Sequence, residues 1–502
     1  MRKHRLALAA TAAALNALLI CLSLSCRTSA RTGETFLGVV PAGWHTVGNT
    51  LSKDRLHVAQ VMVQEDEKQE MVPNGKQRVV MDGKPGPAYD GILKGGPVLS
   101  SDGKHFAYAA LKGSKRLAVI DGRPGPEYDG ILEGTPVLSQ DGARSAYAAL
   151  KDGRWSVVVD GRPGGEYDAV SDIVFSPNGK RLAFRAEKGG AHLVVVDGQP
   201  SPEYGGTGSG TIVFSPDGKR LAYAVRRGDK WLEVLDGQAG PEYDGVTAAV
   251  FSPDGKRVAY GAKVGNKWLG VIDGRPGPAY DAILQGTLLF SSDGTRVGYI
   301  AQAGAKQLPI IDGQPGPAYA AVRNLVFGPD GKRVGYVAFS GTGQVVVIDG
   351  QPGQEYIQSQ QGGPVFSPDG KRVAYYAGSG SKMLVVVDGQ PDPLYDATRD
   401  PVFSPDSKHM AYGAWQNNEW LMVVDGQPRP ETGRSIQTLP VFSRDSKRLA
   451  YLAMEGYKWL AVVDGRPGSE YDAMLTQEPA FQPDGSIEFL AMRADSLFHA
   501  RQ

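Results

Sequence analysis

One repeated unit makes up most of the chain, and its period constrains the fold more than any other feature. Residues 211–246 show the unit: an apolar run, the turn Ser215–Gly218, then Leu221, Tyr223 and Val225 alternating as in a half-buried strand. An Asp-Gly pair closes each unit and recurs every 37 or 39 residues. Its aspartates are Asp82, Asp121, Asp160, Asp197, Asp236, Asp273, Asp312, Asp349, Asp388, Asp425 and Asp464.

The second half of the unit predicts two more strands. Arg227–Asp229 forms a turn, Trp231–Leu235 is the predicted third strand, and a Pro/Gly-rich loop follows Asp236. The loop leads to Glu242–Asp244, which we take as the start of a fourth strand. A sheet of four such short strands is too small to be stable alone, so each unit must pack on its neighbours.

A period near 40 residues with four strands per unit is typical of propeller blades. We therefore predict an all-β propeller of about twelve four-stranded blades. A degenerate first unit spans residues 46–95, ten regular units run to about residue 478, and a truncated unit ends the chain. The isolated strand predicted at 35–40 could complete that last blade and hide its exposed edge.

Ordinary propeller rings have four to eight blades, so twelve blades favour two tandem six-bladed rings. The halves would be residues 46–287 and 288–502. No linker or change of period appears near the middle of the chain. A single oversized ring and an open curved array therefore remain as alternatives.

The turn and second strand resemble those of a known family. Residues Ser215–Tyr223, Ser252–Tyr260 and Ser367–Tyr375 resemble the WD-like repeat of TolB-type propellers, and the resemblance covers about residues 46–502. The Pro/Gly-rich loop, as in Gly122–Asp129, departs from the usual pattern. The resemblance implies a propeller of the bacterial cell envelope with protein partners.

The N-terminus predicts export. Residues 1–26 have a basic start and an apolar stretch, as in a signal peptide, and Cys26 ends a lipoprotein-like box. Cleavage after Ala30 is the alternative, which would give a secreted protein. After the signal peptide of residues 1–26, residues 27–45 would hold a polar tether and the possible closing strand. We expect a periplasmic or outer-membrane lipoprotein that meets the membrane only through Cys26.

Composition and motifs argue against several functions. Lys and Arg total 54, as do Asp and Glu, so no excess of positive charge draws the chain to nucleic acid. Both cysteines lie in the first 26 residues, which leaves the propeller without a thiol site. No catalytic, metal-binding or cofactor motif is present. His105 and His409 stand where other units have Arg, and we interpret them as solvated strand positions.

Departures from the repeat are the candidate binding residues, because specific binding on a rigid scaffold usually lies in its variable loops. A Tyr follows the Asp by seven residues in ten of the eleven units, with Thr432 as the exception, so we expect this Tyr to pack the blades. The residues predicted to bind a partner are Trp44, His45, Trp231, Trp268, Trp415, Asn417, Asn418 and Trp420. For the third-strand tryptophans, a role in the core between blades is the alternative.

These observations predict an exported binding or scaffold protein that is not an enzyme and needs no cofactor. It would recognise an envelope protein or glycan through a loop face or central funnel. A propeller-fold polysaccharide lyase or hydrolase-like enzyme is the alternative.

Overall fold

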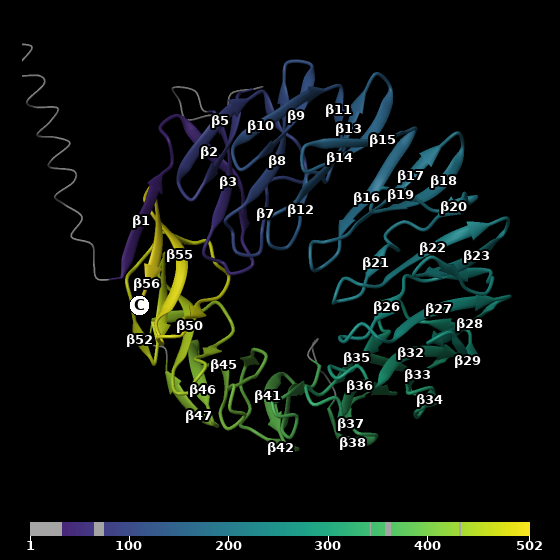
Figure 1. The fold of residues 1–502 in the computed structure, drawn as a ribbon. Coiled ribbons are helices and arrows are strands. Elements are labelled where there is room, and N and C mark those ends of the chain that lie inside the picture. Colours follow the sequence, from purple (N-terminus) through teal and green to yellow (C-terminus); the bar gives the residue numbers. More distant parts are fainter. Residues whose placement is uncertain (1–32, 65–74, 342, 357–362, 431–432) are drawn as a thin grey trace, which may run out of the picture.

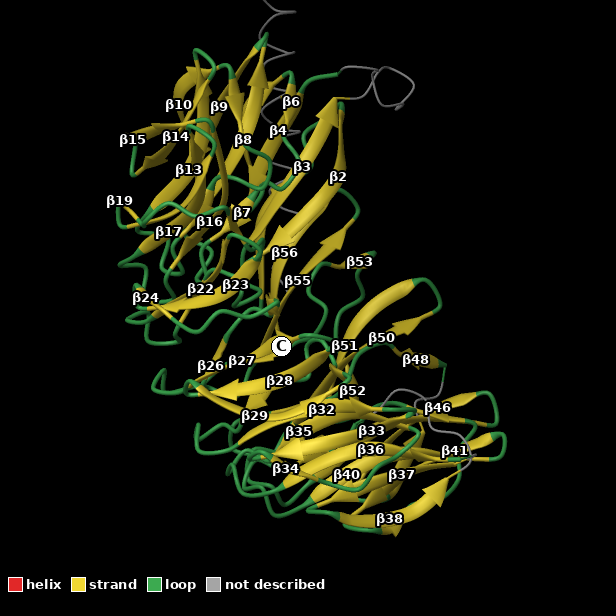
Figure 2. Ribbon diagram, turned by 90° about the vertical axis from the view of Figure 1, so that its right-hand side faces the viewer, coloured by secondary structure: helices red, strands yellow, loops and turns green. Residues whose placement is uncertain are grey.

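The computed structural model describes residues 33–64, 75–341, 343–356, 363–430 and 433–502. The signal segment, Cys26 and Thr432 lie outside them. The regular structure of the described residues is entirely β, without a helix, and forms twelve antiparallel sheets (Figure 2). Each sheet is a blade, and we number the blades from residue 44 in chain order. The predicted all-β propeller of twelve blades is confirmed.

The second and third strands pair with each other antiparallel in every blade. The second strands are β3 Val58–Gln64, β8 Phe106–Lys112, β13 Ser145–Lys151, β17 Leu182–Lys188, β22 Leu221–Arg227, β27 Val258–Val264, β32 Val297–Ala303, β36 Val334–Ser340, β40 Val373–Ser379, β45 Met410–Gln416, β50 Leu449–Glu455 and β55 Ile487–Arg493. The third strands are β4 Gln77–Met81, β9 Lys115–Ile120, β14 Arg154–Val159, β18 Ala191–Val196, β23 Lys230–Leu235, β28 Lys267–Ile272, β33 Lys306–Ile311, β37 Gly343–Ile348, β41 Lys382–Val387, β46 Glu419–Val424, β51 Lys458–Val463 and β56 Ser496–Arg501.

The first strand lies nearest the centre of the ring (Figure 1). It is continuous in β2 Trp44–Leu51, β16 Ala169–Phe175 and β35 Ala321–Phe327, and β39 Val365–Phe366 is a single short piece. The others are split into β6 Gly91–Ile92 and β7 Val98–Leu99, β11 Gly130–Ile131 and β12 Val137–Leu138, β20 Gly206–Thr207 and β21 Val213–Phe214, β25 Gly245–Val246 and β26 Val250–Phe251, β30 Ala282–Ile283 and β31 Leu289–Phe290, β43 Ala397–Thr398 and β44 Val402–Phe403, β48 Arg434–Ile436 and β49 Val441–Phe442, and β53 Ala473–Met474 and β54 Ala480–Phe481.

The fourth, outer strand corrects one prediction. The Pro/Gly-rich segment after the Asp-Gly pair is itself the outer strand. In five blades the Tyr ends this strand, and in five others the strand stops after two residues and the Tyr forms an isolated bridge to the third strand. A bulge between Pro124 and Glu127 accommodates the prolines, which a strand tolerates only at an edge. The outer strands are β5 Lys84–Tyr89, β10 Arg123–Tyr128, β15 Arg162–Tyr167, β19 Gln199–Pro200, β24 Gln238–Ala239, β29 Arg275–Tyr280, β34 Gln314–Pro315, β38 Gln351–Tyr356, β42 Gln390–Pro391, β47 Gln427–Pro430, β52 Arg466–Pro467 and β1 Glu34–Val39.

The N-terminal strand closes the ring, as predicted. β1 pairs antiparallel with β56 as the outer strand of blade 12, with Phe36 opposite Phe498. Blade 12 therefore combines both ends of the described chain (Figure 1). Arg55 of blade 1 forms an ion pair of 2.9 Å with Glu478 of blade 12 across the junction.

The prediction of two six-bladed rings is wrong: the twelve blades form the single oversized ring that was the alternative (Figure 1). Each buried apolar cluster fills one interface between consecutive blades. At the junction of blades 6 and 7, Tyr280 packs against the cluster of Tyr299, Ala301 and Ile310, so the chain continues there as elsewhere. Val58 of blade 1 packs with residues of blade 12 and completes the circle. The same packing at every interface leaves no point where a smaller ring could close.

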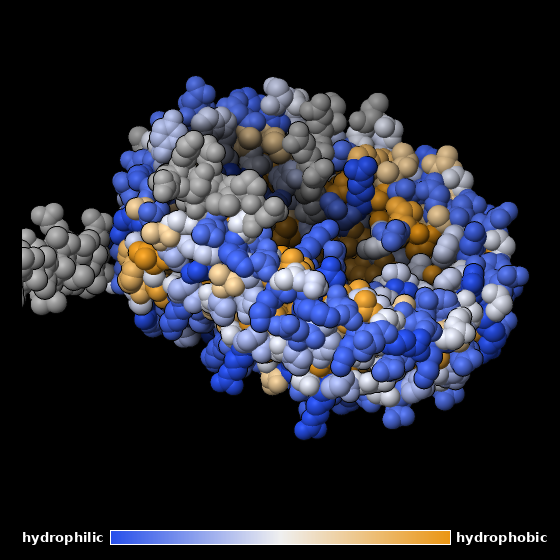
Figure 3. Space-filling model, turned by 90° about the horizontal axis from the view of Figure 1, so that it is seen from above, coloured by the Kyte–Doolittle hydropathy of each residue, from blue (hydrophilic) through white to orange (hydrophobic). Residues whose placement is uncertain are grey.

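The ring is not a flat disc (Figure 2). Seen from above, apolar surface gathers in its hollow, while the outer surface is mainly hydrophilic (Figure 3). Within the described ranges, no helix of a length and apolarity suited to crossing a membrane occurs.

Candidate functional site

An arginine at the start of the second strand connects each regular blade to the next. The aspartate of the Asp-Gly pair, here Asp236, has its backbone in the left-handed region, with a φ of 51°. Its carboxylate accepts hydrogen bonds from the backbone N–H of Leu221 at 2.8 Å and from Nε of Arg220 at 2.9 Å. Arg220 also donates from Nη1 to the carbonyl of Lys256 in the next blade at 2.6 Å, and its guanidinium lies 5.5 Å from the ring centre of Phe251 there. This arginine therefore fastens one blade to the following turn.

Histidine replaces that arginine in three blades. His57, His105 and His409 place Nδ1 at 2.8, 2.9 and 2.7 Å from the aspartates Asp82, Asp121 and Asp425. The two histidines that we interpreted as solvated positions are thus half-exposed and bonded to the blade's own aspartate. The imidazole keeps the contact to the aspartate, but it is too short to supply the arginine's second connection.

The repeated Tyr closes the other end of each interface. Tyr243, at the end of its outer segment, contacts Tyr260 of the next blade edge-to-face with ring centres 6.4 Å apart. Such an arrangement is the favourable one for two aromatic rings. The same contact recurs in Tyr89–Tyr108, Tyr128–Tyr147, Tyr167–Phe184, Tyr319–Tyr336, Tyr395–Tyr412 and Tyr471–Phe489. These contacts give the repeated Tyr the packing role that we expected.

The interface between blades 10 and 11 departs from the regular unit at both ends. His409 replaces the arginine at one end, and the sequence has Thr432 where other units have the Tyr. Two cavities lie along this interface. One of about 390 Å³ lies beside the β45–β46 hairpin, and one of about 600 Å³ lies beside the turns that hold His409.

We call the first cavity the aromatic groove. It is lined by Trp415, Asn418, Glu419, Trp420, Gly433, Arg434, Ser435, Gln437, Met454 and Gly456. Trp415 and Trp420 face each other across the hairpin with ring centres 5.5 Å apart and an interplanar angle of 60°. The guanidinium of Arg399 covers one side of Trp420 at 4.8 Å from the ring centre. Arg399 also donates to the carbonyl of Ile436 in blade 11, which holds this wall of the groove in place.

The hairpin turn explains the two asparagines that the sequence singled out. Asn417 and Asn418 have φ angles of 53° and 63°, as a type I′ turn requires, and Asn tolerates this region well. The backbone N–H of Asn417 donates to Asp396 at 3.3 Å. The turn projects the exposed Asn418 to the edge of the groove.

The structure brings together only some of the predicted binding residues. Trp415, Asn418 and Trp420 line one groove, and Asn417 adjoins it. Trp44 lies in blade 1, where the guanidinium of Arg78 stacks on its ring at 3.7 Å, and His45 follows it on β2. Trp231 and Trp268 lie half-buried in blades 5 and 6, each opposite the Tyr that ends its own blade. Cys26 is outside the described residues.

Three residues at the groove were not predicted from the sequence: Arg399, which lies between β43 and β44, Arg434, which begins β48, and Gln437, which follows β48. For Arg434 and Gln437 a signal was present, because the segment after Asp425 has Arg429 and Thr432 where most units have Gly and Tyr. Within the described part of the chain, no group of three or more His, Cys, Asp or Glu side chains could hold a metal ion.

No protein-family model matches the sequence, and the comparison with curated proteins finds no match. Solved propellers are similar only at a low level. A structure described as the eukaryotic initiation factor has a TM-score of 0.33 at 14% identity, over 64% of this chain and 94% of that chain. The Dos1 propeller has a TM-score of 0.29 at 13% identity, over 56% of this chain and 90% of that chain.

TolB from Acinetobacter baumannii has a TM-score of 0.23 at 15% identity, over 52% of this chain and 78% of that chain. Scores of this size do not assign the chain to a family. The twelve-bladed ring is established by the chain's own strand pairing.

Proposed function

We propose that this chain is an exported binding scaffold of the bacterial cell envelope that holds a protein partner in the aromatic groove. One observation carries the proposal: Trp415, Trp420 and Arg434 line an open groove at the interface where the repeat's own packing residues are replaced. Trp and Arg are the side chains that most often dominate the binding energy of protein interfaces. Binding by a groove on a rigid ring also needs no moving part.

The surroundings of the groove fit a peptide segment of a partner. Glu419, Ser435 and Gln437 add hydrogen-bonding groups around the two indoles, and Met454 adds an adaptable apolar side chain. A partner needs both kinds of contact, because buried polar groups of a peptide must find hydrogen bonds. Export and the lipid anchor at Cys26 rest on the N-terminal sequence, and the envelope location also follows from the resemblance to TolB-type repeats.

A site-specific photo-crosslinker tests the groove directly. The crosslinking residue would replace Asn418 in the full-length protein, produced in bacterial cells, and adducts would be identified by mass spectrometry. Asn266 is the matched control, since it occupies the same hairpin turn in blade 6, away from the groove. We expect a defined protein adduct from position 418, none from position 266, and loss of that adduct when Trp420→Ala is added.

Equal adducts from both positions would contradict a specific groove. If only a glycan were captured, the partner would be a carbohydrate and not a protein, since aromatic side chains also provide stacking surfaces for sugars. Turnover of a polysaccharide by the purified protein would instead support the enzymatic alternative.

A further inference from the structure

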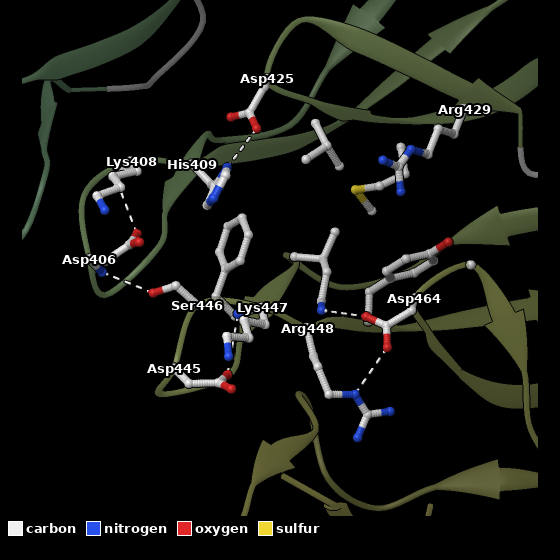
Figure 4. Close-up of a pocket in the computed structure, with 16 residues that line it drawn as sticks. Asp406, Lys408, His409, Asp425, Arg429, Asp445, Ser446, Lys447, Arg448 and Asp464 are labelled. Atoms are coloured by element: carbon white, nitrogen blue, oxygen red, sulfur yellow. Dashed lines mark hydrogen bonds and ion pairs between the residues drawn. The ribbon is translucent and has the colours of Figure 1, made fainter.

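The larger cavity between blades 10 and 11 is shown in Figure 4. It lies beside the turns, at the opposite end of the interface from the aromatic groove beside the β45–β46 hairpin. We call it the basic cavity. Its apolar wall is formed by Met422, Phe442 and Leu449, and charged side chains stand around it. Similar cavities of about 340 Å³ and about 670 Å³ occur between blades 3 and 4 and between blades 8 and 9. Size therefore does not distinguish the basic cavity, but its hydrogen-bond donors do.

In the regular cavity between blades 8 and 9, the cationic donor is already occupied. Arg333 bonds Asp349 at 2.8 Å and the carbonyl of Lys371 at 2.7 Å. Its guanidinium also lies over Phe366 of the next blade. The outer strand contributes Gly353, which has no side chain to offer a ligand. This cavity therefore presents little that could bind a charged molecule.

In the basic cavity, His409 replaces that arginine and keeps one nitrogen available. Its Nδ1 lies 2.7 Å from Asp425, while Nε2 has no hydrogen-bond partner among the described residues. In blade 1, His57 rests on the next turn so closely that a Cβ on Gly103 would lie 2.4 Å from it. The equivalent residue after blade 10 is Ser446, which carries a Cβ. The His409 ring therefore cannot pack against the next turn as the His57 ring packs against Gly103.

Arg429 is the second departure at this site. The repeat has glycine four residues after the Asp in eight blades: Gly86, Gly125, Gly164, Gly240, Gly277, Gly316, Gly353 and Gly468. In blade 9 the position holds Asp392, which accepts a hydrogen bond of 2.9 Å from Tyr412 of the next blade. A side chain at this position can therefore reach across the interface. Arg429 lines the basic cavity and has no hydrogen bond or ion pair from its side chain within the described chain (Figure 4).

The acidic side chains around the cavity are already bonded. Asp425 accepts bonds from His409 and from the backbone N–H of Met410. Asp464 accepts bonds from Arg448 and from the backbone N–H of Leu449. Arg448 is occupied in turn, since it also donates to the carbonyl of Gly485. The donors left over are the guanidinium of Arg429, Nε2 of His409 in its imidazolium form, and the ammonium groups of Lys408 and Lys447, which also line the cavity. The ligand must supply the acceptor.

We propose that the basic cavity binds a small molecule that has a carboxylate or phosphate group on an apolar body. The guanidinium of Arg429 binds the anionic group, because charge-assisted hydrogen bonds to carboxylate and phosphate are the strong ones. Nδ1 of His409 donates to Asp425, so Nε2 adds a second hydrogen bond to the anion in the imidazolium form, in which both ring nitrogens carry a proton. Met422, Phe442 and Leu449 contact the apolar part. The site is separate from the aromatic groove, so it stands whether or not the groove binds a protein.

Calorimetric titration of the folded protein tests the proposal with four probes: benzoate, phenyl phosphate, inorganic phosphate and neutral benzyl alcohol. We expect benzoate or phenyl phosphate to bind one-to-one with a dissociation constant below about 1 mM. Benzyl alcohol should bind about tenfold more weakly, because it lacks the charge. Preference between the two aromatic anions identifies the group as carboxylate or phosphate.

Two variants restore the regular repeat and should therefore fold. Arg429→Gly should weaken binding of the anion about tenfold or more, through loss of a charge-assisted contact. His409→Arg should weaken binding as well. The new arginine would bond Asp425 and a carbonyl of the next turn, as Arg333 bonds Asp349 and the carbonyl of Lys371, and would leave no donor at this position for the ligand. Arg466→Gln is the control, since it removes a positive charge from the outer strand of blade 11 without touching the cavity.

Three outcomes would overturn the proposal. These are absence of binding by every anionic probe to the wild type, unchanged binding in Arg429→Gly, and an equal loss in Arg466→Gln. If inorganic phosphate bound as tightly as phenyl phosphate, the apolar wall would contribute nothing to binding, and the proposal of an apolar body on the ligand would be wrong.

Discussion

Glu34 and Arg493 form the ion pair that closes the ring, although they lie 459 residues apart in the chain. Nη2 of Arg493 is 3.0 Å from Oε1 of Glu34, and Nη1 is 3.1 Å from Oε2. The hydroxyl of Tyr471 donates to the same carboxylate at 2.7 Å, and the guanidinium stacks on the Tyr471 ring. The side chain of Glu34 is only 10% exposed, so the contact fixes β1 to the last blade.

Glu34→Gln should therefore destabilise the ring by about 2 kcal/mol at neutral pH. The hydrogen bonds from Arg493, followed by that from Tyr471, lower the pKa of Glu34 although burial opposes them. A lowered pKa stabilises the fold above the unfolded value of 4.5, and this stabilisation is lost as pH falls through the folded value. The difference in free energy of unfolding between the wild type and Glu34→Gln should therefore become smaller in acid.

Urea denaturation at several pH values measures this difference, and hydrogen exchange of β1 shows whether the strand opens. Glu127→Gln is the control, because that glutamate pairs with Lys112 on the exposed surface. Unchanged exchange in β1 of the Glu34 variant would show that the ion pair does not hold the closing strand.

Glu233 is a buried acid at the interface of blades 5 and 6. It is 3% exposed, and neither carboxylate oxygen has a hydrogen-bond partner among the described residues. Burial raises its pKa to about 8 from the usual 4.5. The folded protein therefore holds the proton more tightly than the unfolded chain, and stability should fall as pH rises from 4.5 to about 8.

Glu233→Val inserts the residue that blades 3, 4, 8 and 9 have at this position. We expect it to stabilise the protein by about 2 kcal/mol at pH 7, because it removes an unpaired buried polar group. The gain should increase between pH 5 and pH 9 in calorimetric melting curves. Glu242→Gln, an exposed carboxyl on the same blade, should change neither stability nor its pH dependence. A gain that does not vary with pH would contradict the raised pKa.

Arg257 tests the connection between blades. It bonds Asp273 at 2.9 Å and the carbonyl of Thr295 in blade 7 at 2.5 Å. Arg257→Ala should cost about 2 kcal/mol, since both acceptors lose a charged donor. Arg257→His should cost less, because the imidazole can keep the bond to Asp273 as His409 does to Asp425. Lys256→Ala removes a largely exposed neighbour and should be neutral in the same denaturation experiment.

Cys26 tests export and anchoring. Cys26→Ser should abolish incorporation of a labelled fatty acid and release the protein from the membrane fraction of the producing bacterium. Cys21→Ser is the control and should leave the label in place, because that cysteine lies inside the apolar segment. A wild-type protein without label, whose mature N-terminus follows Ala30, would support ordinary signal cleavage instead.

The blade was predictable because its signals are local. Turn residues such as Pro216 and Gly218 and the alternation of Leu221, Tyr223 and Val225 act within a few residues of one another. The outer strand was misplaced because its bulge and prolines, as in Pro124, follow no regular alternation. The outer strand can be recognised only from its pairing with the third strand in the folded blade.

The candidate groove was predictable only in part. Trp415, Asn418 and Trp420 stood out because they depart from their own unit, and they lie on one hairpin. Arg434 and Gln437 belong to the following unit, and no sequence rule places them opposite these indoles. Trp44, Trp231 and Trp268 looked equivalent in the sequence, but they lie in other blades.

The sequence by itself determined the repeating unit, its three inner strands and the number of blades, because hydrogen bonds and turns within 40 residues specify them. The tertiary structure decided that twelve blades close one ring and which departures meet at the interface of blades 10 and 11. The reason is that closure depends on the small rotation between packed blades, added over all twelve interfaces. Side chains such as Tyr243 and Arg220 set that rotation only once neighbouring blades are in contact.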